Sequence, residues 1–127
     1  MKDFKKYYII DAPPDMVYTA LTNAATIQLW TGAPVIMEPV EGTEFSLWED
    51  SIVGKNLTFI PGKKIEQEWY FGEQPAPSIV TILLHEHKNG TSAELRHTNI
   101  PDEDFDNITE GWTTDYFGSL IDFYKED

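Results

Sequence analysis

The sequence changes its hydrophobic period once, and this change limits its possible folds more than any other feature. From Val35 to Asn99 apolar and polar residues alternate, with Phe45 and Leu47 facing the same way. After Pro101 the apolar residues recur every three or four positions, which is the spacing of one face of an α-helix. The chain therefore predicts an α+β protein in which antiparallel strands precede one long amphipathic helix.

Short turn sequences divide the elements that we expect. A first strand runs to Ile10, and two short helices follow it, the second capped by Asn23 and ending near Trp30. Beyond the strand that carries Phe45, we expect strands at Ile52–Ile60, Lys64–Phe71, Ile79–His87 and Thr91–Asn99. Turns fall at Pro61-Gly62, at Gln74-Pro75-Ala76-Pro77 and at Asn89-Gly90. A helix from about Asp102 to about Tyr124 completes the order β-α-α-β-β-β-β-β-α.

Composition narrows the class of protein. The 127 residues suit a single domain spanning 1–127, and they include no cysteine, which excludes disulfides, thiolate metal sites and cysteine nucleophiles. No early apolar run resembles a signal peptide or a membrane span, so we expect a soluble, cytoplasmic protein. The formal charge of -13 opposes contact with nucleic-acid phosphates and anionic lipid, and neither is an expected partner.

Side chains at alternate strand positions should point into the space between sheet and helix. There they either fill a core or line a cavity that binds a hydrophobic or aromatic small molecule. Both interpretations stay open for the candidates, which are Phe45, Leu47, Phe59, Gln67, Trp69, Ile82, Leu84, Leu95, His97, Trp112 and Tyr116. Trp48 has the opposite parity, so we expect it on the outer face with Tyr70.

Two polar residues stand out among these candidates. His97 shares its strand face with Leu95, so we expect its imidazole to lie inward, near Trp112 or Tyr116. A buried imidazole needs partners, either structural ones or a ligand. Gln67 should place an amide in the same interior.

The sequence contains no complete motif for catalysis or metal binding. His85 and His87 share one strand face, but a third ligand is missing, and the acidic residues 102–106 lack the spacing of a calcium loop. Neither a nucleophile elbow nor a phosphate-binding loop occurs. We therefore expect no metal, no cofactor and no catalytic residue.

Several segments in order carry a family resemblance. They are residues 42–48, Gly54, residues 61–69, Val80-Thr81-Ile82, residues 97–101, and Gly111-Trp112 with Leu120. Together they resemble the homologues of activators of the ninety-kilodalton heat-shock protein ATPase, within the START-like superfamily. The resemblance implies a helix-grip fold, in which a curved antiparallel sheet wraps around the long carboxy-terminal helix with a cavity between them.

The resemblance also implies a function and two alternatives to it. It implies a noncatalytic module that binds a hydrophobic or aromatic small molecule and is linked to stress response. One alternative is a co-chaperone that stimulates a heat-shock protein ATPase. The eukaryotic co-chaperone has an additional amino-terminal domain, and we expect 127 residues to be too few to include it. The other alternative is a cyclase- or hydratase-like enzyme that uses His97.

Overall fold

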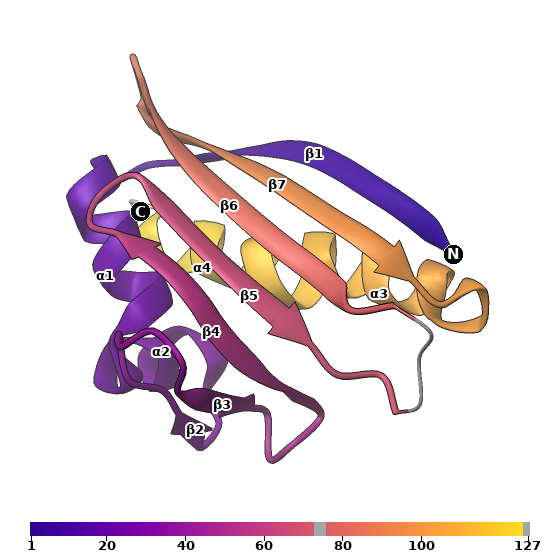
Figure 1. The fold of residues 1–127 in the computed structure, drawn as a ribbon. Coiled ribbons are helices and arrows are strands. Elements are labelled where there is room, and N and C mark those ends of the chain that lie inside the picture. Colours follow the sequence, from indigo (N-terminus) through magenta and orange to yellow (C-terminus); the bar gives the residue numbers. More distant parts are fainter. Residues whose placement is uncertain (73–75, 126–127) are drawn as a thin grey trace.

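A curved antiparallel sheet forms one layer of the structure, a computed structural model that describes residues 1–72 and 76–125. Its seven strands lie in the order β1-β7-β6-β5-β4-β3-β2 (Figure 1). The strands are β1 (Lys2–Ile10), β2 (Val35–Ile36), β3 (Glu44–Leu47), β4 (Ile52–Ile60), β5 (Lys64–Trp69), β6 (Ser78–His87) and β7 (Gly90–Ile100). The five strands β3 to β7 follow one another along the chain as predicted, and β2 is a short strand that the sequence did not suggest.

Two short helices, α1 (Pro14–Thr22) and α2 (Ala24–Thr31), connect β1 to β2. Asn23 separates them, and its side-chain oxygen accepts a hydrogen bond from the Thr26 backbone N–H at 3.0 Å. The predicted cap is confirmed. α1 packs against β6 and β7 and so closes one end of the sheet.

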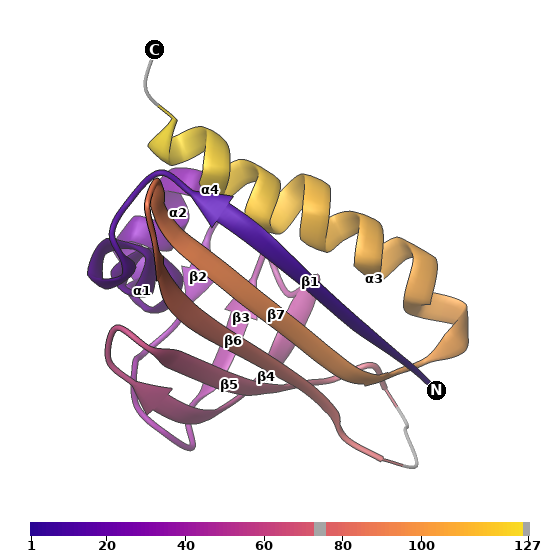
Figure 2. The same ribbon diagram turned by 90° about the horizontal axis from the view of Figure 1, so that it is seen from above.

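The carboxy-terminal segment is helical from residue 102 to residue 124 without interruption. A 3-10 turn at Asp102–Asp104 leads into α3 (Phe105–Gly111), a π-helical turn at Trp112–Tyr116, and α4 (Phe117–Tyr124). Figure 2 shows this run lying across the concave side of the sheet. The predicted fold class, an α+β helix-grip arrangement, is confirmed. The sequence did not predict the π-helical turn at residues 112–116, which we call the π turn.

Two glycines of this helix differ because of the π turn. A Cβ atom at Gly118 would lie 2.5 Å from the Thr113 carbonyl oxygen, far inside van der Waals contact. A Cβ atom at Gly111 would meet no atom within 4 Å. The sequence therefore needs glycine after the π turn and leaves space before it.

Three predicted strands differ from the observed ones at their ends: β6 begins one residue earlier, at Ser78, and β7 extends by one residue at each end, from Gly90 to Ile100. β5 ends at Trp69, so Phe71 lies beyond it, and the predicted turn at Gln74-Pro75 lies outside the described residues. Among the described residues, no helix is long and apolar enough to cross a membrane.

The interior changes character along the strands. Ile82 pairs with Leu95 and Leu84 with Ala93, and these four side chains are buried near α1. Further along β6, towards its first residue, Val80 pairs with His97. Polar and aromatic side chains therefore follow aliphatic ones from one end of the interior to the other.

Candidate functional site

A cavity of about 580 Å³ opens between the carboxy-terminal helix and the turn that follows β3. Its lining residues are Thr31, Trp48, Ser51, Ile52, Trp69, Asn107, Ile108, Gly111, Trp112, Asp115, Tyr116 and Ser119. We call it the aromatic cavity. Another hollow, of about 700 Å³, lies at the surface beside residues 11–14 and 86–90 and has no Trp, Tyr or Phe in its lining.

The floor of the aromatic cavity consists of three buried rings. Trp69, Trp112 and Tyr116 are at most 5% exposed. The rings of Trp69 and Trp112 stack at 4.6 Å between centroids, and the Tyr116 ring lies 4.6 Å from that of Trp112. All three were predicted to face the interior, and the structure brings them together.

Trp48 forms a wall of the cavity, so the prediction that it faces outward is wrong. β3 ends at Leu47, and Trp48 has a positive φ of 50°, as do Glu49 and Asp50 after it. This left-handed turn ends the alternation of strand faces on which the prediction relied. The Trp48 ring meets that of Tyr116 edge to face at 6.2 Å. Its predicted outer-face partner, Tyr70, is 38% exposed.

One helix face supplies half of the lining. Ile108, Gly111, Trp112, Asp115, Tyr116 and Ser119 follow one another at spacings of three and one, which is the pattern of a single helical stripe. A stripe that only filled a core would be apolar throughout. Gly111, Asp115 and Ser119 are small or polar, so this stripe is not apolar throughout. Their presence on the same helix face as Trp112 and Tyr116 was the sequence signal from which the cavity could have been predicted.

His97 lies inward beside Trp112, as predicted, with no exposed surface. The Trp112 indole N–H donates to Nδ1 of His97 at 2.9 Å, so the imidazole carries its proton on Nε2. That N–H faces the Ser78 hydroxyl at 2.8 Å, and the hydroxyl donates to the Thr98 carbonyl at 3.1 Å. Both ring nitrogens therefore have partners within the protein.

The charge state of His97 follows from this environment. Burial lowers the pKa of His97 to about 3, because the imidazolium would lose its hydration. A proton on Nδ1 would also point at the indole N–H, where one donor would face another. The imidazole is neutral at physiological pH.

A second buried chain of hydrogen bonds begins at Trp69. Its indole N–H donates to Oε1 of Gln67 at 3.0 Å, and Nε2 of Gln67 donates to Oδ1 of Asn56 at 3.0 Å. The Asn56 amide then donates to the Glu38 carbonyl and the Thr43 hydroxyl. The inward position of Gln67 is as predicted. Asn56 was missed, although its polar side chain on a mostly apolar strand was a visible signal.

The Tyr116 hydroxyl differs from these indole groups. It has no hydrogen-bond partner among the described residues. In the same residues, every side-chain nitrogen or oxygen that is fully buried does have a partner. The hydroxyl oxygen therefore keeps some exposed surface, and Tyr116 is a lining residue of the cavity. Burial raises the pKa of Tyr116, so this hydroxyl keeps its proton and offers it as a donor.

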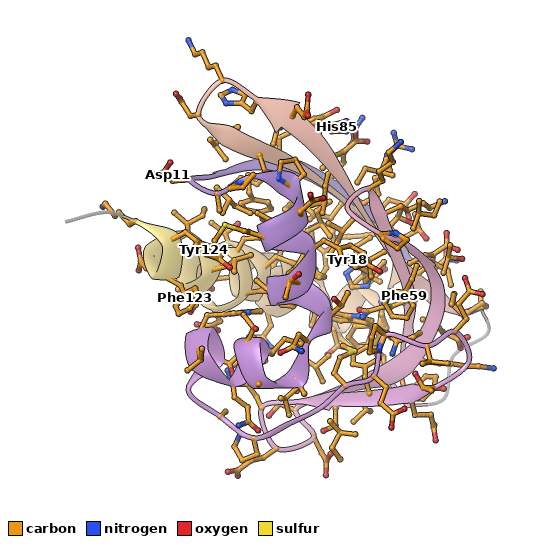
Figure 3. The ribbon with its side chains drawn as sticks, turned by 90° about the vertical axis from the view of Figure 1, so that its left-hand side faces the viewer. Asp11, Tyr18, Phe59, His85, Phe123 and Tyr124 are labelled. Atoms are coloured by element: carbon orange, nitrogen blue, oxygen red, sulfur yellow. The ribbon has the colours of Figure 1, made fainter. Side chains whose placement is uncertain are left out.

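The remaining candidates lie away from the cavity. Phe45, Leu47, Ile82, Leu84 and Leu95 are buried in the core, and none belongs to the lining. Phe59 on β4 is half-buried at the end that Figure 3 views, where Tyr18 of α1 is also labelled. Direct ligand contacts by these residues, and by Gln67 and His97, remain predictions.

The histidine pair on β6 does not gather a metal site. His85 lies on the sheet away from the helices (Figure 3), and its Nε2 is 2.9 Å from a carboxylate oxygen of Glu94. His87 accepts a hydrogen bond from the Asn89 backbone N–H through Nδ1. In residues 1–72 and 76–125, no three metal-ligating side chains come together.

A family comparison adds to this geometry. The model described as "Activator of Hsp90 ATPase homolog 1-like protein" matches residues 11–121. The chain belongs to this family. The resemblance noted in the sequence is thereby confirmed.

Two curated relatives are longer than this chain. An "Activator of 90 kDa heat shock protein ATPase homolog" from Dictyostelium discoideum is 34% identical over 102 residues, which are 78% of this chain and 27% of that protein. An uncharacterized protein from Schizosaccharomyces pombe is 25% identical over 91% of this chain and 34% of its own length. The chain thus spans about a third or less of these curated relatives.

Solved structures of similar size share the fold. An HSP90 activator from Plasmodium falciparum has a TM-score of 0.86 at 25% identity, over 98% of this chain and 99% of that one. The Aha1 dimer from Colwellia psychrerythraea has a TM-score of 0.84 at 20% identity, over 98% and 96% of the two chains. The family fold is therefore found in chains of this length.

Proposed function

We propose that this family member is a noncatalytic binding module whose aromatic cavity takes a hydrophobic or aromatic small molecule. The observation that carries the proposal is a space of about 580 Å³ above a floor of three buried rings. Ligand sites commonly have this size and combine apolar walls with a few polar groups. The half-buried Trp48, Ile52 and Ile108 provide contact area above the three floor rings, and the Tyr116 hydroxyl provides a donor.

The exposure of the lining supports entry from solvent. Ser51, Asn107 and Asp115 at the rim are exposed, whereas Trp69 and Trp112 below them are buried. A ligand would therefore exchange water at the rim for aromatic surface at the floor. Removal of apolar area from water stabilises such a complex by about 25 cal/mol for each Å².

The position of His97 favours binding over catalysis. An enzyme that used His97 as acid or base would need one ring nitrogen free for substrate. Nδ1 and Nε2 are hydrogen-bonded to Trp112 and Ser78, and His97 does not belong to the cavity lining. We assign these hydrogen bonds the role of fixing the Trp112 ring in the floor.

A cavity-filling variant tests the proposal. Gly111 lines the cavity, has helical backbone angles and leaves room for a side chain, so Gly111→Leu should fill the space without breaking the helix. The neutral fluorescent probe N-phenyl-1-naphthylamine should bind the parent protein and fail to bind Gly111→Leu. Thr114→Leu is the matched control, because Thr114 is exposed on the same helix and does not line the cavity.

Equal probe binding by the parent and Gly111→Leu, or no binding by the parent, would contradict the proposal. Circular dichroism of both variants would establish that the helix remains. Loss of binding in Thr114→Leu as well would assign the effect to the helix surface instead of the cavity.

Docking to a chaperone is a second candidate function. The names of the Dictyostelium relative and the Plasmodium structure, both Hsp90 activators, favour it. The acidic charge of -13 would then meet a basic surface, so complex formation should weaken as ionic strength rises. Titration of the chain into an Hsp90 at several salt concentrations, with ATP turnover as a second readout, tests this function. We expect at most weak stimulation by this chain, and strong stimulation at equimolar protein would contradict that expectation.

A further inference from the structure

We infer that the ligand of the aromatic cavity is an organic cation, an ammonium group carried on a hydrophobic or aromatic body. The inference rests on the proposed function, since it assumes that the cavity is a binding site. It goes further by naming the charge of the ligand. Three independent features of the lining support it.

The first feature is the orientation of the tryptophans. The indole N–H groups of Trp69 and Trp112 are already bonded to Gln67 and His97, neither of which lines the cavity. These two buried rings therefore offer the cavity no N–H donor and only ring carbon, and one face of each is covered because the two rings stack on one another. The face of an indole is the strongest aromatic attractor of an ammonium group.

The second feature is the enclosure of the space by aromatic rings. Trp48 stands as a wall above the floor, with its ring centroid 6.2 Å from that of Tyr116 at an interplanar angle of 62°. The Tyr116 and Trp112 rings are themselves inclined at 58°. Rings inclined to one another can approach a compact cation from several sides, as in an aromatic cage.

The third feature is the charge of the lining. Its one acidic residue is Asp115, exposed at the rim, and no Lys, Arg or His belongs to the lining given above. An anionic ligand would face this carboxylate and four electron-rich rings. A cation would gain both, and the charge of -13 on the whole chain adds a long-range attraction.

The π turn explains how the sequence brings these groups together. It spans Trp112 to Tyr116, and both of its end residues belong to the floor. Asp115, immediately before Tyr116, reaches the same cavity. Single π turns inside α-helices recur at functional sites, where they move a side chain relative to regular helix geometry.

An isosteric pair of ligands tests the charge directly. Phenyltrimethylammonium and tert-butylbenzene have the same shape and differ in the positive charge. Their dissociation constants would be measured by quenching of tryptophan fluorescence, with benzenesulfonate as the anionic comparison. We expect the ammonium compound to bind about tenfold more tightly than tert-butylbenzene. Benzenesulfonate should bind more weakly than either.

A matched pair of variants then separates the local carboxylate from overall charge. Asp115→Asn should weaken binding of phenyltrimethylammonium by roughly threefold, the scale of a partly exposed ion pair, and leave tert-butylbenzene unaffected. Asp122→Asn removes the same charge from the exposed surface of α4, outside the cavity lining, and should change neither affinity.

Each other outcome has a distinct meaning. Equal or tighter binding of tert-butylbenzene, or of benzenesulfonate, overturns the cation inference and leaves the binding module intact. A protein that binds N-phenyl-1-naphthylamine but does not bind phenyltrimethylammonium also overturns the cation inference and leaves the binding module intact. Failure of every probe, including the naphthylamine, overturns the proposed function together with the inference. An unchanged ammonium affinity in Asp115→Asn removes Asp115 from the site.

Discussion

The two ends of the interior are built from different side chains. Near α1, the aliphatic end contains Ile82, Leu84, Ala93 and Leu95, buried side chains outside the cavity lining. Towards the π turn, the aromatic end contains rings, two chains of hydrogen bonds and an open space of about 580 Å³. The same strands β6 and β7 run through both ends, so the difference comes from side chains and from the helix above.

The contrast indicates a division of roles. Aliphatic side chains pack densely, and their burial stabilises the sheet against the helices. At the aromatic end, two of the rings that border the cavity are held by hydrogen bonds from their indole N–H groups. Trp112 is fixed in this way by His97, and Trp69 by Gln67. The aromatic end therefore combines hydrogen-bonded rings with an open space.

The largest expected effect would break the aromatic end altogether. Trp112→Ala should lower the free energy of unfolding by about 3 to 5 kcal/mol, because it removes a buried ring and leaves Nδ1 of His97 without its donor. Thermal or urea unfolding measures this change. Trp48→Ala, in a half-buried wall, should cost a fraction of that amount. Unfolding of Trp112→Ala at the parent temperature would contradict the burial of the ring.

The next expected effect is a pH dependence of the free energy of unfolding, which His97 contributes at the aromatic end. The folded pKa of His97 is lowered to about 3, below its unfolded value of roughly 6.5. The unfolded chain therefore binds a proton first, and stability is lost as pH falls from about 6.5 towards 3. This residue contributes a slope of about 1.4 kcal/mol for each pH unit in that window.

Comparison with His97→Gln isolates this slope, because glutamine can accept from Trp112 and donate to Ser78 but does not titrate. Urea unfolding of both proteins between pH 4 and about 7 should give a smaller pH slope for the variant. Identical slopes would contradict a neutral, buried His97.

A glycine pair sharpens the contrast along the helix itself. Gly118→Ala should destabilise the protein by roughly 1 to 3 kcal/mol, because the new Cβ would press on the Thr113 carbonyl oxygen beside the π turn. Gly111→Ala should instead stabilise it by about 0.4 to 1 kcal/mol, since a helical position with free space gains from alanine. Thermal unfolding would measure both. The opposite order of stabilities would exclude the π turn.

Much of the fold could be predicted from the sequence because strand parity and helical spacing are local properties. The inward positions of Gln67 and His97 follow from the alternation around Leu95 and Trp69, and both are as predicted. Parity failed at Trp48, where a left-handed turn ends β3 and no alternation continues. Strand parity does not identify partners across the sheet, so Asn56 and Ser78 were missed as members of the two hydrogen-bond chains.

The cavity could not be predicted from parity, because the same residue pattern describes a filled and an open interior. The decisive residues were Gly111, Asp115 and Ser119, which share a helix face with Trp112 and Tyr116. The sequence predicts one helix that runs through Gly111, and the backbone angles of Gly111 are helical. The π turn itself depends on contacts between helix and sheet that a local pattern does not contain.

A ligand should bind at the aromatic end of the interior and leave the aliphatic end unaffected. Amide and indole N–H chemical shifts of the labelled protein during titration with N-phenyl-1-naphthylamine test this most directly. We expect saturable shifts at Gly111, Asp115, Tyr116 and the Trp48 indole, with Leu84 and Ala93 unchanged. Saturable shifts confined to the aliphatic end or to the hollow beside residues 11–14, or no shifts at all, would contradict the account.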